Sequence, residues 1–425
     1  MSLKLFFRYK SELIFLSSGF ITPFVGFVVG LINAKYIPPY EMGVINSVLL
    51  IVNYLSFIQL GVFNGLNRNI SFYKSKGKNY KVQSMVDTSF ITSKVVSIIS
   101  VSIICVVLGW NMWDGSSSPS NVIYGSYFLL LVIMIFLPRN SHYDVTFKSS
   151  QEFSTLGKIV LGENISYLLF SLSTVFWGIW GKLFADANKY VIGFFLRRRY
   201  SPFFFKREQS KEAYIELVQT GFPLLLGGYI WSLFTIADQT YIAAYLGKQN
   251  MGEYTLSRLL ISALTVIPTL LNTLLYPKAA SIFGQKEAAN SLRPFWVKSV
   301  LLFTAIIIPI SIIAYICLPP LVYTFLPLYS DGISSAKINI LTGITFISMG
   351  PSVIFGTLRK NILYLIFVCI SLLLFWGVLF LFRDKFLTLE SVAWLRFAVS
   401  LFLSVFVLVY TCLLYTSPSP RDISG

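Results

Sequence analysis

Charged residues are scarce in this sequence. Only 12% of its 425 residues are Asp, Glu, Lys or Arg, whereas 55% are hydrophobic. A typical soluble protein carries about 25% charged residues, so a soluble chain of this composition would lack the polar groups to cover its surface. The soluble enzyme classes are therefore excluded, and the composition indicates an integral membrane protein with many spans.

Histidine and cysteine are nearly missing as well. The single histidine, His142, cannot form a two-histidine metal site, and we expect it to be a polar loop residue. The four cysteines form no CxxC motif and no Cys/His cluster, so we expect no metal, no cofactor and no disulfide framework. Cys105, Cys317 and Cys369 lie in apolar runs and are expected to be buried, inert thiols. No phosphate-binding loop occurs, so the sequence does not favour direct use of ATP.

Long apolar runs are abundant, and each run of about 20 residues is enough for a helix to cross a bilayer. The sequence predicts twelve spans, so that we expect an all-α integral membrane protein. The span at 180–196 is the weakest, because it contains Lys182, Asp186, Asn188 and Lys189. The predicted spans are 11–33, 43–62, 87–109, 122–138, 156–177, 180–196, 219–244, 254–276, 297–318, 336–358, 361–382 and 390–411.

The charge that is present is mostly positive, with 34 Lys and Arg against 18 Asp and Glu. Lys and Arg concentrate in loops that alternate along the chain, which is the bias that places loops on the cytoplasmic side. We therefore expect both termini in the cytoplasm and the loops Asn111–Asn121 and Pro319–Ser334 on the outer face. Because the positive excess lies in membrane loops and not on a soluble basic face, we expect no nucleic-acid partner. Under this topology the outer loops contain few cations, namely Lys35, Lys182, Lys248, Arg383 and Lys385.

The longest basic loop, 197–216, divides the chain into two predicted six-span lobes, 1–196 and 217–411. Six spans per lobe make the halves a parallel repeat. A similar motif supports this interpretation: Tyr36-Ile37, Met42-Gly43 and Ser47-Val-Leu-Leu-Ile51 in the first half correspond to Tyr245-Leu246, Met251-Gly252 and Ser257-Arg-Leu-Leu-Ile261 in the second. The end of the chain, 412–425, begins CLLYTSPSPRD and resembles translated sequencing-adaptor sequence, so we exclude it from functional arguments.

Several motifs resemble those of a known family. They are Leu60-Gly61-Val-Phe-Asn-Gly-Leu-Asn-Arg68, Gly221-Phe-Pro-Leu-Leu-Leu-Gly-Gly228, Ile236-Ala-Asp-Gln239, Tyr245-Leu-Gly247, Met251-Gly-Glu-Tyr254 and Tyr276-Pro277. This pattern resembles the Wzx-type flippases of the multidrug/oligosaccharidyl-lipid/polysaccharide exporter superfamily. The resemblance implies a MATE-like bundle of twelve helices around a cavity that opens alternately to each membrane face. It also implies transport of an undecaprenyl-pyrophosphate-linked repeat unit of O-antigen, capsule or exopolysaccharide across the bacterial cytoplasmic membrane. The implied partners are this lipid-linked glycan, membrane lipids, a glycan polymerase and a chain-length regulator.

Flipping breaks no bond, so the candidate residues are those that would hold a polar head group within the membrane. Ionisable side chains inside spans are costly to insert and are functional candidates for that reason. We expect Asp238 and Arg258, in consecutive spans, to pair across the cavity, with Arg258 contacting the diphosphate. Structural ion pairs and snorkelling side chains remain the alternatives. The other candidate substrate-binding residues are Lys94, Arg68, Arg396, Gln239, Asn272 and Asn53, and Glu163 is a further ionisable residue within a span.

Two other functions stay open. A drug or cation antiporter of the same superfamily would couple export to an ion through buried carboxylates, and acids are scarce in the first six spans. A membrane-embedded glycan polymerase or acyltransferase would need a large outer loop rich in Arg and His, and the longest predicted outer loop contains neither. We therefore expect a transporter and not an enzyme.

Overall fold

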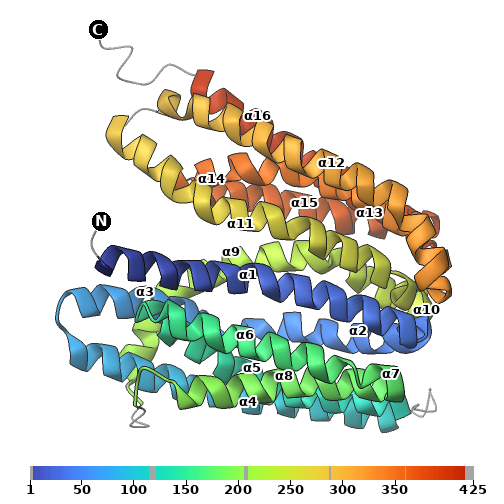
Figure 1. Ribbon diagram of the computed structural model, residues 1–425, viewed down its shortest axis with the longest axis horizontal. Helices are drawn as coiled ribbons and strands as arrows, with labels where there is room; N and C mark the ends of the chain where they lie inside the picture. The colour runs from blue at the N-terminus through green and yellow to red at the C-terminus, as the bar shows by residue number, and fades with distance from the viewer. Residues whose placement is uncertain (1–2, 114–120, 205–208, 287–288, 359, 417–425) are drawn as a thin grey trace. The chain divides into compact units, whose positions relative to one another are not determined.

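The computed structural model describes residues 3–113, 121–204, 209–286, 289–358 and 360–416, and within these ranges every regular element is a helix (Figure 1). A lipid environment offers no hydrogen-bond partner for the backbone, so an apolar chain satisfies its N–H and C=O groups within helices. The predicted all-α fold is confirmed.

The first half of the chain forms eight α-helices and one short 3₁₀ turn. They are α1 (Leu3–Tyr36), α2 (Pro39–Leu55), η1 (Ser56–Gln59), α3 (Val62–Ser75), α4 (Asn79–Trp113), α5 (Asn121–Ser149), α6 (Phe153–Ser171), α7 (Thr174–Trp177) and α8 (Ile179–Arg199). Within this half, α4 packs beside α5, and α6 packs beside both α1 and α8.

The second half begins with a long helix that passes into a π-helical turn. Its elements are α9 (Lys211–Tyr241), η2 (Ile242–Leu246), α10 (Gly247–Glu253), α11 (Thr255–Lys286), η3 (Ala289–Leu292), α12 (Arg293–Phe325), η4 (Pro327–Gly332), α13 (Ile333–Ile344), η5 (Thr345–Ser348), α14 (Met349–Thr357), α15 (Asn361–Leu381), η6 (Arg383–Lys385) and α16 (Leu389–Thr416). Here α11 packs against α13 and α14, and α16 packs against α13 and α15.

Eleven helical segments of the described residues are long and apolar enough to cross a membrane. They coincide with eleven of the twelve predicted spans. The twelfth, 180–196, is α8, a continuous 21-residue helix whose charged residues make it more polar than the others. The prediction of about twelve membrane helices is therefore confirmed.

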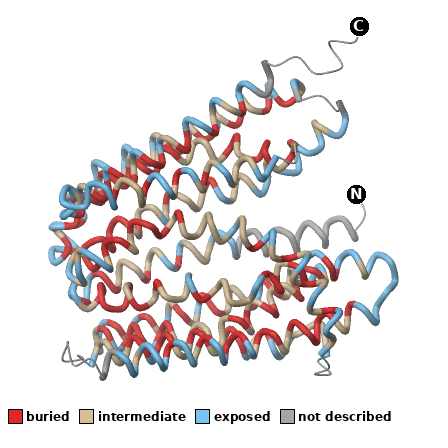
Figure 2. Tube along the Cα trace, turned by 180° about the vertical axis from the view of Figure 1, so that it is seen from behind, coloured by how far each residue is buried: buried red, intermediate tan, exposed pale blue. Residues whose placement is uncertain are grey.

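Three local predictions are wrong. The helix α12 continues through Pro319 and Pro320 to Phe325, so the expected loop Pro319–Ser334 is mostly helical. The helix can continue because residues 319–325 are mostly apolar and membrane helices tolerate proline. His142 is not in a loop but fully buried in α5, where its Nδ1 lies 3.0 Å from the Ser89 hydroxyl. Cys105 and Cys317 are exposed on their helices instead of buried, because an apolar run in a membrane protein also faces lipid (Figure 2).

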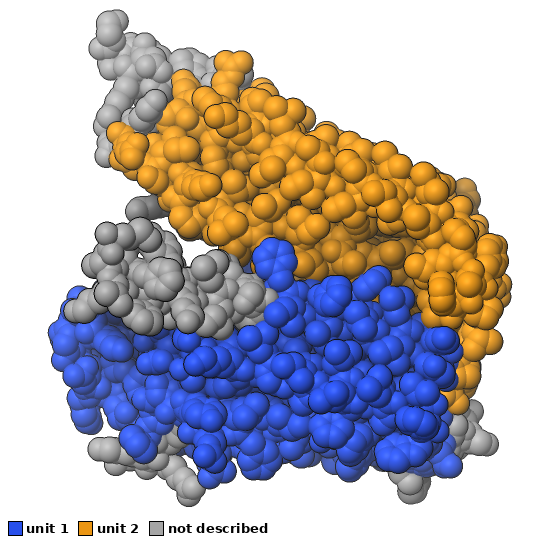
Figure 3. Space-filling view, in the orientation of Figure 1, with its two compact units in different colours: residues 1–37, 44–229 blue, residues 38–43, 230–425 orange. Residues whose placement is uncertain are grey.

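The described chain forms two compact units, which Figure 3 colours separately: residues 1–37 with 44–229, and residues 38–43 with 230–425. Of the three boundaries, one lies between α1 and α2, and the other two fall inside helices, after Gly43 in α2 and after Tyr229 in α9. The first half of α9 belongs to the first unit because its backbone touches that of the η1–α3 region, at Gly61 against Gly221 and at Gly65 against Leu217. The lobes that we predict from the basic loop 197–216 are a different division of the chain.

The two copies of the repeated motif meet at a reciprocal contact. A Cβ atom added at Gly43 would lie 1.7 Å from the carbonyl oxygen of Lys248, and one at Gly252 would lie 1.7 Å from that of Pro39. Each glycine thus packs on the carbonyl four residues before the other glycine. When two related segments pack through the same surface, residue i of one contacts residue j of the other and the reverse contact also forms. The reciprocal glycine contact therefore supports the parallel repeat.

Candidate functional site

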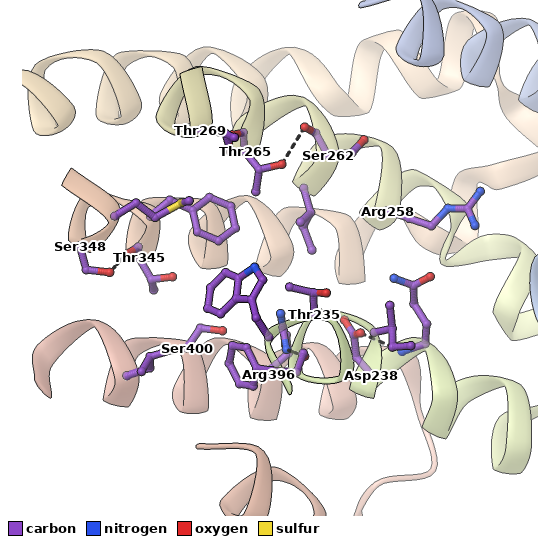
Figure 4. Close-up of a pocket in the computed structure, with 18 of the residues that line it drawn as sticks. Thr235, Asp238, Arg258, Ser262, Thr265, Thr269, Thr345, Ser348, Arg396 and Ser400 are labelled. Carbon is purple, nitrogen blue, oxygen red and sulfur yellow. Dashed lines mark hydrogen bonds between the residues drawn. The ribbon is translucent and has the colours of Figure 1, made fainter. Parts of the chain in front are cut away.

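A cavity of about 370 Å³ lies within the second unit, between α9, α11, η5, α15 and α16. Ligand pockets usually measure about 300–1,000 Å³, so this cavity is large enough for a sugar-sized group. Figure 4 shows that polar side chains from several helices converge on it. Four of the predicted site residues line it: Asp238, Gln239, Arg258 and Arg396.

Arg396 is the deepest cation of this cavity, with an exposed fraction of 4%. One guanidinium nitrogen donates a hydrogen bond to the Phe234 carbonyl, and the guanidinium lies 4.3 Å from the centre of the Phe234 ring. Its Nε has no hydrogen-bond partner, and among the described residues no carboxylate lies within ion-pair distance. A buried charge is costly unless it is paired, so Arg396 favours an anionic group bound in the cavity.

Asp238 lies one turn after Phe234 on α9 and is 1% exposed. Its carboxylate accepts a hydrogen bond of 2.6 Å from the Tyr254 hydroxyl and one of 2.8 Å from the Gln239 backbone N–H. The amide of Asn339 in turn donates to the Tyr254 oxygen at 3.0 Å. Asp238 is therefore held by the neutral Tyr254 hydroxyl and by its own helix, and Asn339 of α13 holds Tyr254 in turn.

The expected ion pair between Asp238 and Arg258 is not formed in this structure. Figure 4 shows the Arg258 side chain directed away from Asp238 and Arg396, and Asp238 instead receives its hydrogen bonds from Tyr254 and Gln239. Arg258 is only partly buried, although it does line the cavity. Sequence spacing placed both residues near one level of neighbouring helices, but the direction of each side chain depends on how the helices are rotated.

A stripe of hydroxyl groups runs along α11 on the cavity side. Ser262, Thr265 and Thr269 lie three and four residues apart, so they share one face of the helix. Each hydroxyl donates its proton back to a carbonyl of its own helix, over 2.8–2.9 Å. Their oxygens can therefore act only as acceptors toward a ligand. Further hydroxyls come from other elements: Thr235, Thr345, Ser348 and Ser400.

Aromatic rings cover part of the cavity wall. Trp231 lies 5.8 Å from Phe234 and 6.2 Å from Tyr364, measured between ring centres. These rings give a flat apolar surface beside the Arg396 cation. Together, one fixed cation, a row of acceptors and an aromatic wall can bind an anionic molecule that is rich in hydroxyl groups.

The remaining predicted site residues lie elsewhere. Lys94, Arg68 and Asn53 belong to the first unit; Lys94 is partly buried over the Phe90 ring, and Arg68 is exposed on α3. Asn272 continues the α11 stripe beyond Thr269 but does not line the cavity, and its side-chain oxygen is buried without a partner. Glu163 pairs with Arg197 at 2.8 Å.

The sequence profile of the polysaccharide biosynthesis protein family matches residues 9–283. The chain belongs to this family. No curated protein matches the sequence at a significant level. The predicted family resemblance is therefore confirmed at the level of the family.

Solved structures of membrane transporters have a fold similar to that of this chain. A multidrug resistance MATE family transporter of the MOP superfamily, in an inward-facing conformation, is 12% identical with a TM-score of 0.79, covering 96% of this chain and 99% of that one. An outward-facing structure of such a transporter gives a TM-score of 0.68 at 12% identity, with 96% of each chain covered. A MOP superfamily transporter from Pyrococcus furiosus, described as having a binding pocket of reverse polarity, gives 0.66 at 12% identity and the same coverage. The family and the fold are those of membrane transporters.

Sequence reasoning missed the hydroxyl stripe and Tyr254 in this family member. A signal for the stripe is present, because Arg258, Ser262, Thr265, Thr269 and Asn272 recur at helical spacing within an otherwise apolar span. That period marks a polar face of a membrane helix. Tyr254 carried no such signal, since its role depends on Asp238 and Asn339, which other helices bring to it.

Proposed function

We propose that this protein flips a polyprenyl-diphosphate-linked oligosaccharide across the membrane, with the diphosphate at Arg396 and sugar hydroxyls on the α11 stripe. The observation that carries the proposal is the unpaired, buried Arg396 in a cavity lined by hydroxyl acceptors. Family membership supports a substrate from polysaccharide biosynthesis.

The charge balance of the cavity favours an anionic substrate. Arginine binds phosphate oxygens with a planar set of donors, and attraction between charges is stronger where water is excluded. Among the described residues Asp238 forms no ion pair with Arg396, so the carboxylate does not neutralise the guanidinium by direct contact. A cationic drug would meet Arg396 without a free carboxylate to pair with.

The hydrogen-bond direction favours a sugar. Because Ser262, Thr265 and Thr269 donate to their own helix, they require donors from the ligand, and sugar hydroxyls provide such donors. The aromatic wall at Trp231 and Tyr364 offers a surface for a sugar ring. A purely apolar ligand would leave these acceptors unsatisfied.

The first unit gives less support to the antiporter alternative. Three of its acids have basic partners: Glu163 and Asp144 bind Arg197 at 2.8 and 2.7 Å, and Asp186 binds Lys182 at 2.6 Å. A fourth, the buried Asp87, accepts a hydrogen bond from the Gln83 amide. A carboxylate that couples transport to an ion must gain and lose that ion, and a tight ion pair opposes this exchange.

We place the protein in a bacterial cytoplasmic membrane, with a glycan polymerase and a chain-length regulator as functional partners.

The test uses the purified protein in vesicles that contain a fluorescent polyprenyl-diphosphate-linked oligosaccharide. A quencher that cannot cross the membrane reports which leaflet holds the lipid. Arg396→Gln should slow flipping about 10–100-fold, since a hydrogen bond to a charged group contributes about 1.5–3 kcal/mol. Arg396→Lys should keep part of the rate, because lysine retains the charge but not the planar geometry.

Arg198→Gln is the matched control, since Arg198 is an exposed arginine of the first unit. Both variants are compared at equal abundance and melting temperature, which separates loss of contact from loss of fold. Wild-type flipping by Arg396→Gln would refute the role of Arg396. Efflux of a cationic dye without any movement of the lipid would instead support the antiporter.

A further inference from the structure

The first unit has a strongly basic surface that the cavity does not explain. It consists of Lys74, Lys76, Lys78 and Lys81, at the turn between α3 and α4, together with Arg198 and Arg199 at the end of α8, and all six are exposed. We call this surface the basic rim. No Asp or Glu occurs between residues 62 and 86, and none of the six cations forms an ion pair with a described residue.

Exposed aromatic rings accompany these cations. Tyr80 is 85% exposed and Phe204 is 93% exposed, and Phe72 and Tyr200 are also exposed. The Lys76 ammonium lies 4.1 Å from the centre of the Phe72 ring, and the Arg199 guanidinium lies 6.0 Å from that of Tyr200. Aromatic rings with Lys and Arg are typical of the bilayer interface, where the ring enters the boundary and the cation meets head groups.

Packing joins the two parts of the rim. The Gln83 side-chain amide in α4 donates a hydrogen bond of 2.6 Å to the Phe204 carbonyl. Phe203 packs on the same apolar cluster as Val82 and Ile70, so the 200–204 segment lies against the first turns of α4. The rim is therefore one surface and not two separate basic segments.

The helix beneath the rim is fixed in place. One face of α3 is buried, through Val62, Leu66 and Ile70. The Tyr73 hydroxyl donates a hydrogen bond to the Glu216 carboxylate of α9. This hydrogen bond raises the pKa of Tyr73, so the hydroxyl keeps its proton and remains a donor. The exposed lysines are thus presented by an ordered helix pair.

The position of the rim along α4 matches the depth of lipid head groups. Lys81 lies six residues before the predicted span 87–109, which is about 9 Å at 1.5 Å per residue. The head-group layer adds about 5–8 Å on each side of the hydrocarbon core, and a lysine side chain can extend back toward it.

We propose that the basic rim binds the head groups of anionic phospholipids in the surrounding bilayer. Six exposed cations that form no ion pair with a described residue match the negative surface of such a leaflet, and the exposed rings match its interface. This proposal does not depend on the substrate of the cavity.

The first experiment measures lipid preference. The protein is extracted from bilayers of phosphatidylglycerol mixed with phosphatidylcholine, and the retained lipids are counted by native mass spectrometry. The variant K74Q/K76Q/K78Q/K81Q should lose at least half of the wild-type excess of phosphatidylglycerol. The control K35Q/K248Q/K337Q/K385Q removes the same net charge from other places and should keep that excess. Equal loss in both variants, or no loss in the first, would overturn the proposal.

The second experiment measures depth. The native cysteines are replaced by serine, a spin label is attached through Tyr80→Cys, and its collisions with oxygen and with a water-soluble nickel complex are compared. We expect a label at head-group depth in bilayers containing phosphatidylglycerol and a shallower one in phosphatidylcholine alone. A label in bulk water in both bilayers would overturn the proposal, and it is the result expected if the rim instead binds an acidic protein.

Discussion

Arg197 shows how a single residue can organise several helices in this protein. It lies near the end of α8, is 5% exposed, and donates to Asp144 of α5 and Glu163 of α6. A Cβ atom at Gly193, one turn earlier, would lie 2.6 Å from the Arg197 guanidinium, so a side chain there would require the guanidinium to shift. Three helices of the first unit are therefore linked through one guanidinium group.

We predict that Arg197→Met destabilises the protein by about 3–5 kcal/mol, because removing one partner of a buried ion pair leaves uncompensated charge. Thermal unfolding in detergent, followed by size-exclusion chromatography, measures the change. Arg198→Met is the control, since its side chain is exposed and should alter the stability by at most about 0.5 kcal/mol. Equal melting temperatures for the two variants would contradict this role.

At the same scale, residue types were easier to predict than their partners. Buried cations and acids inside spans were recognisable in the sequence, and Arg396 and Asp238 do line the cavity. The partner of Asp238 was not recognisable, because Tyr254 reaches it from the next helical segment and is itself held by Asn339 of α13. His142 was misplaced because the polar residues around it suggested a loop, whereas the histidine itself forms a buried polar contact with Ser89 between α5 and α4.

At the scale of elements, the spans were predictable because length and apolar composition decide whether a segment crosses a membrane. The helix α3 was not predicted, since it is a short amphipathic helix that buries only one face. Its place is fixed by tertiary contacts with α9, where Gly61 and Gly221 allow the two backbones to touch. The positive φ of Leu60 and Gly61, 48° and 82°, turns the chain into this helix.

The reciprocal glycine contact gives a prediction for the elements α2 and α10. Gly252→Ala would place a methyl group 1.7 Å from the Pro39 carbonyl oxygen, so the two helices must separate. Overpacking of this kind costs about 1–3 kcal/mol, and the melting temperature and the amount of folded protein should fall.

Gly227→Ala is the matched control, because nothing lies within 4 Å of an added Cβ atom there. Alanine also has the higher helix propensity, so this variant should be neutral or slightly stabilising. The close-contact interpretation fails if Gly252→Ala is as stable as Gly227→Ala.

At the scale of the whole molecule, the distribution of Lys and Arg predicts its orientation in the membrane. We expect Lys76 on the cytoplasmic side and Ser330 outside. A membrane-impermeant thiol reagent added to intact cells should label Ser330→Cys but not Lys76→Cys, after the native cysteines are replaced. Labelling of Lys76→Cys in intact cells would reverse the predicted topology.

The place where the chain passes between its two units has a consequence for how it unfolds. Independent domains are usually joined by exposed flexible linkers, but here two of the three boundaries lie inside helices, in α2 and in α9. If one unit melted, the other would lose part of the helix they share, including its backbone hydrogen bonds. In lipid those bonds have no substitute from water. We therefore expect the removal of either unit to disrupt the helices α2 and α9 that the units share.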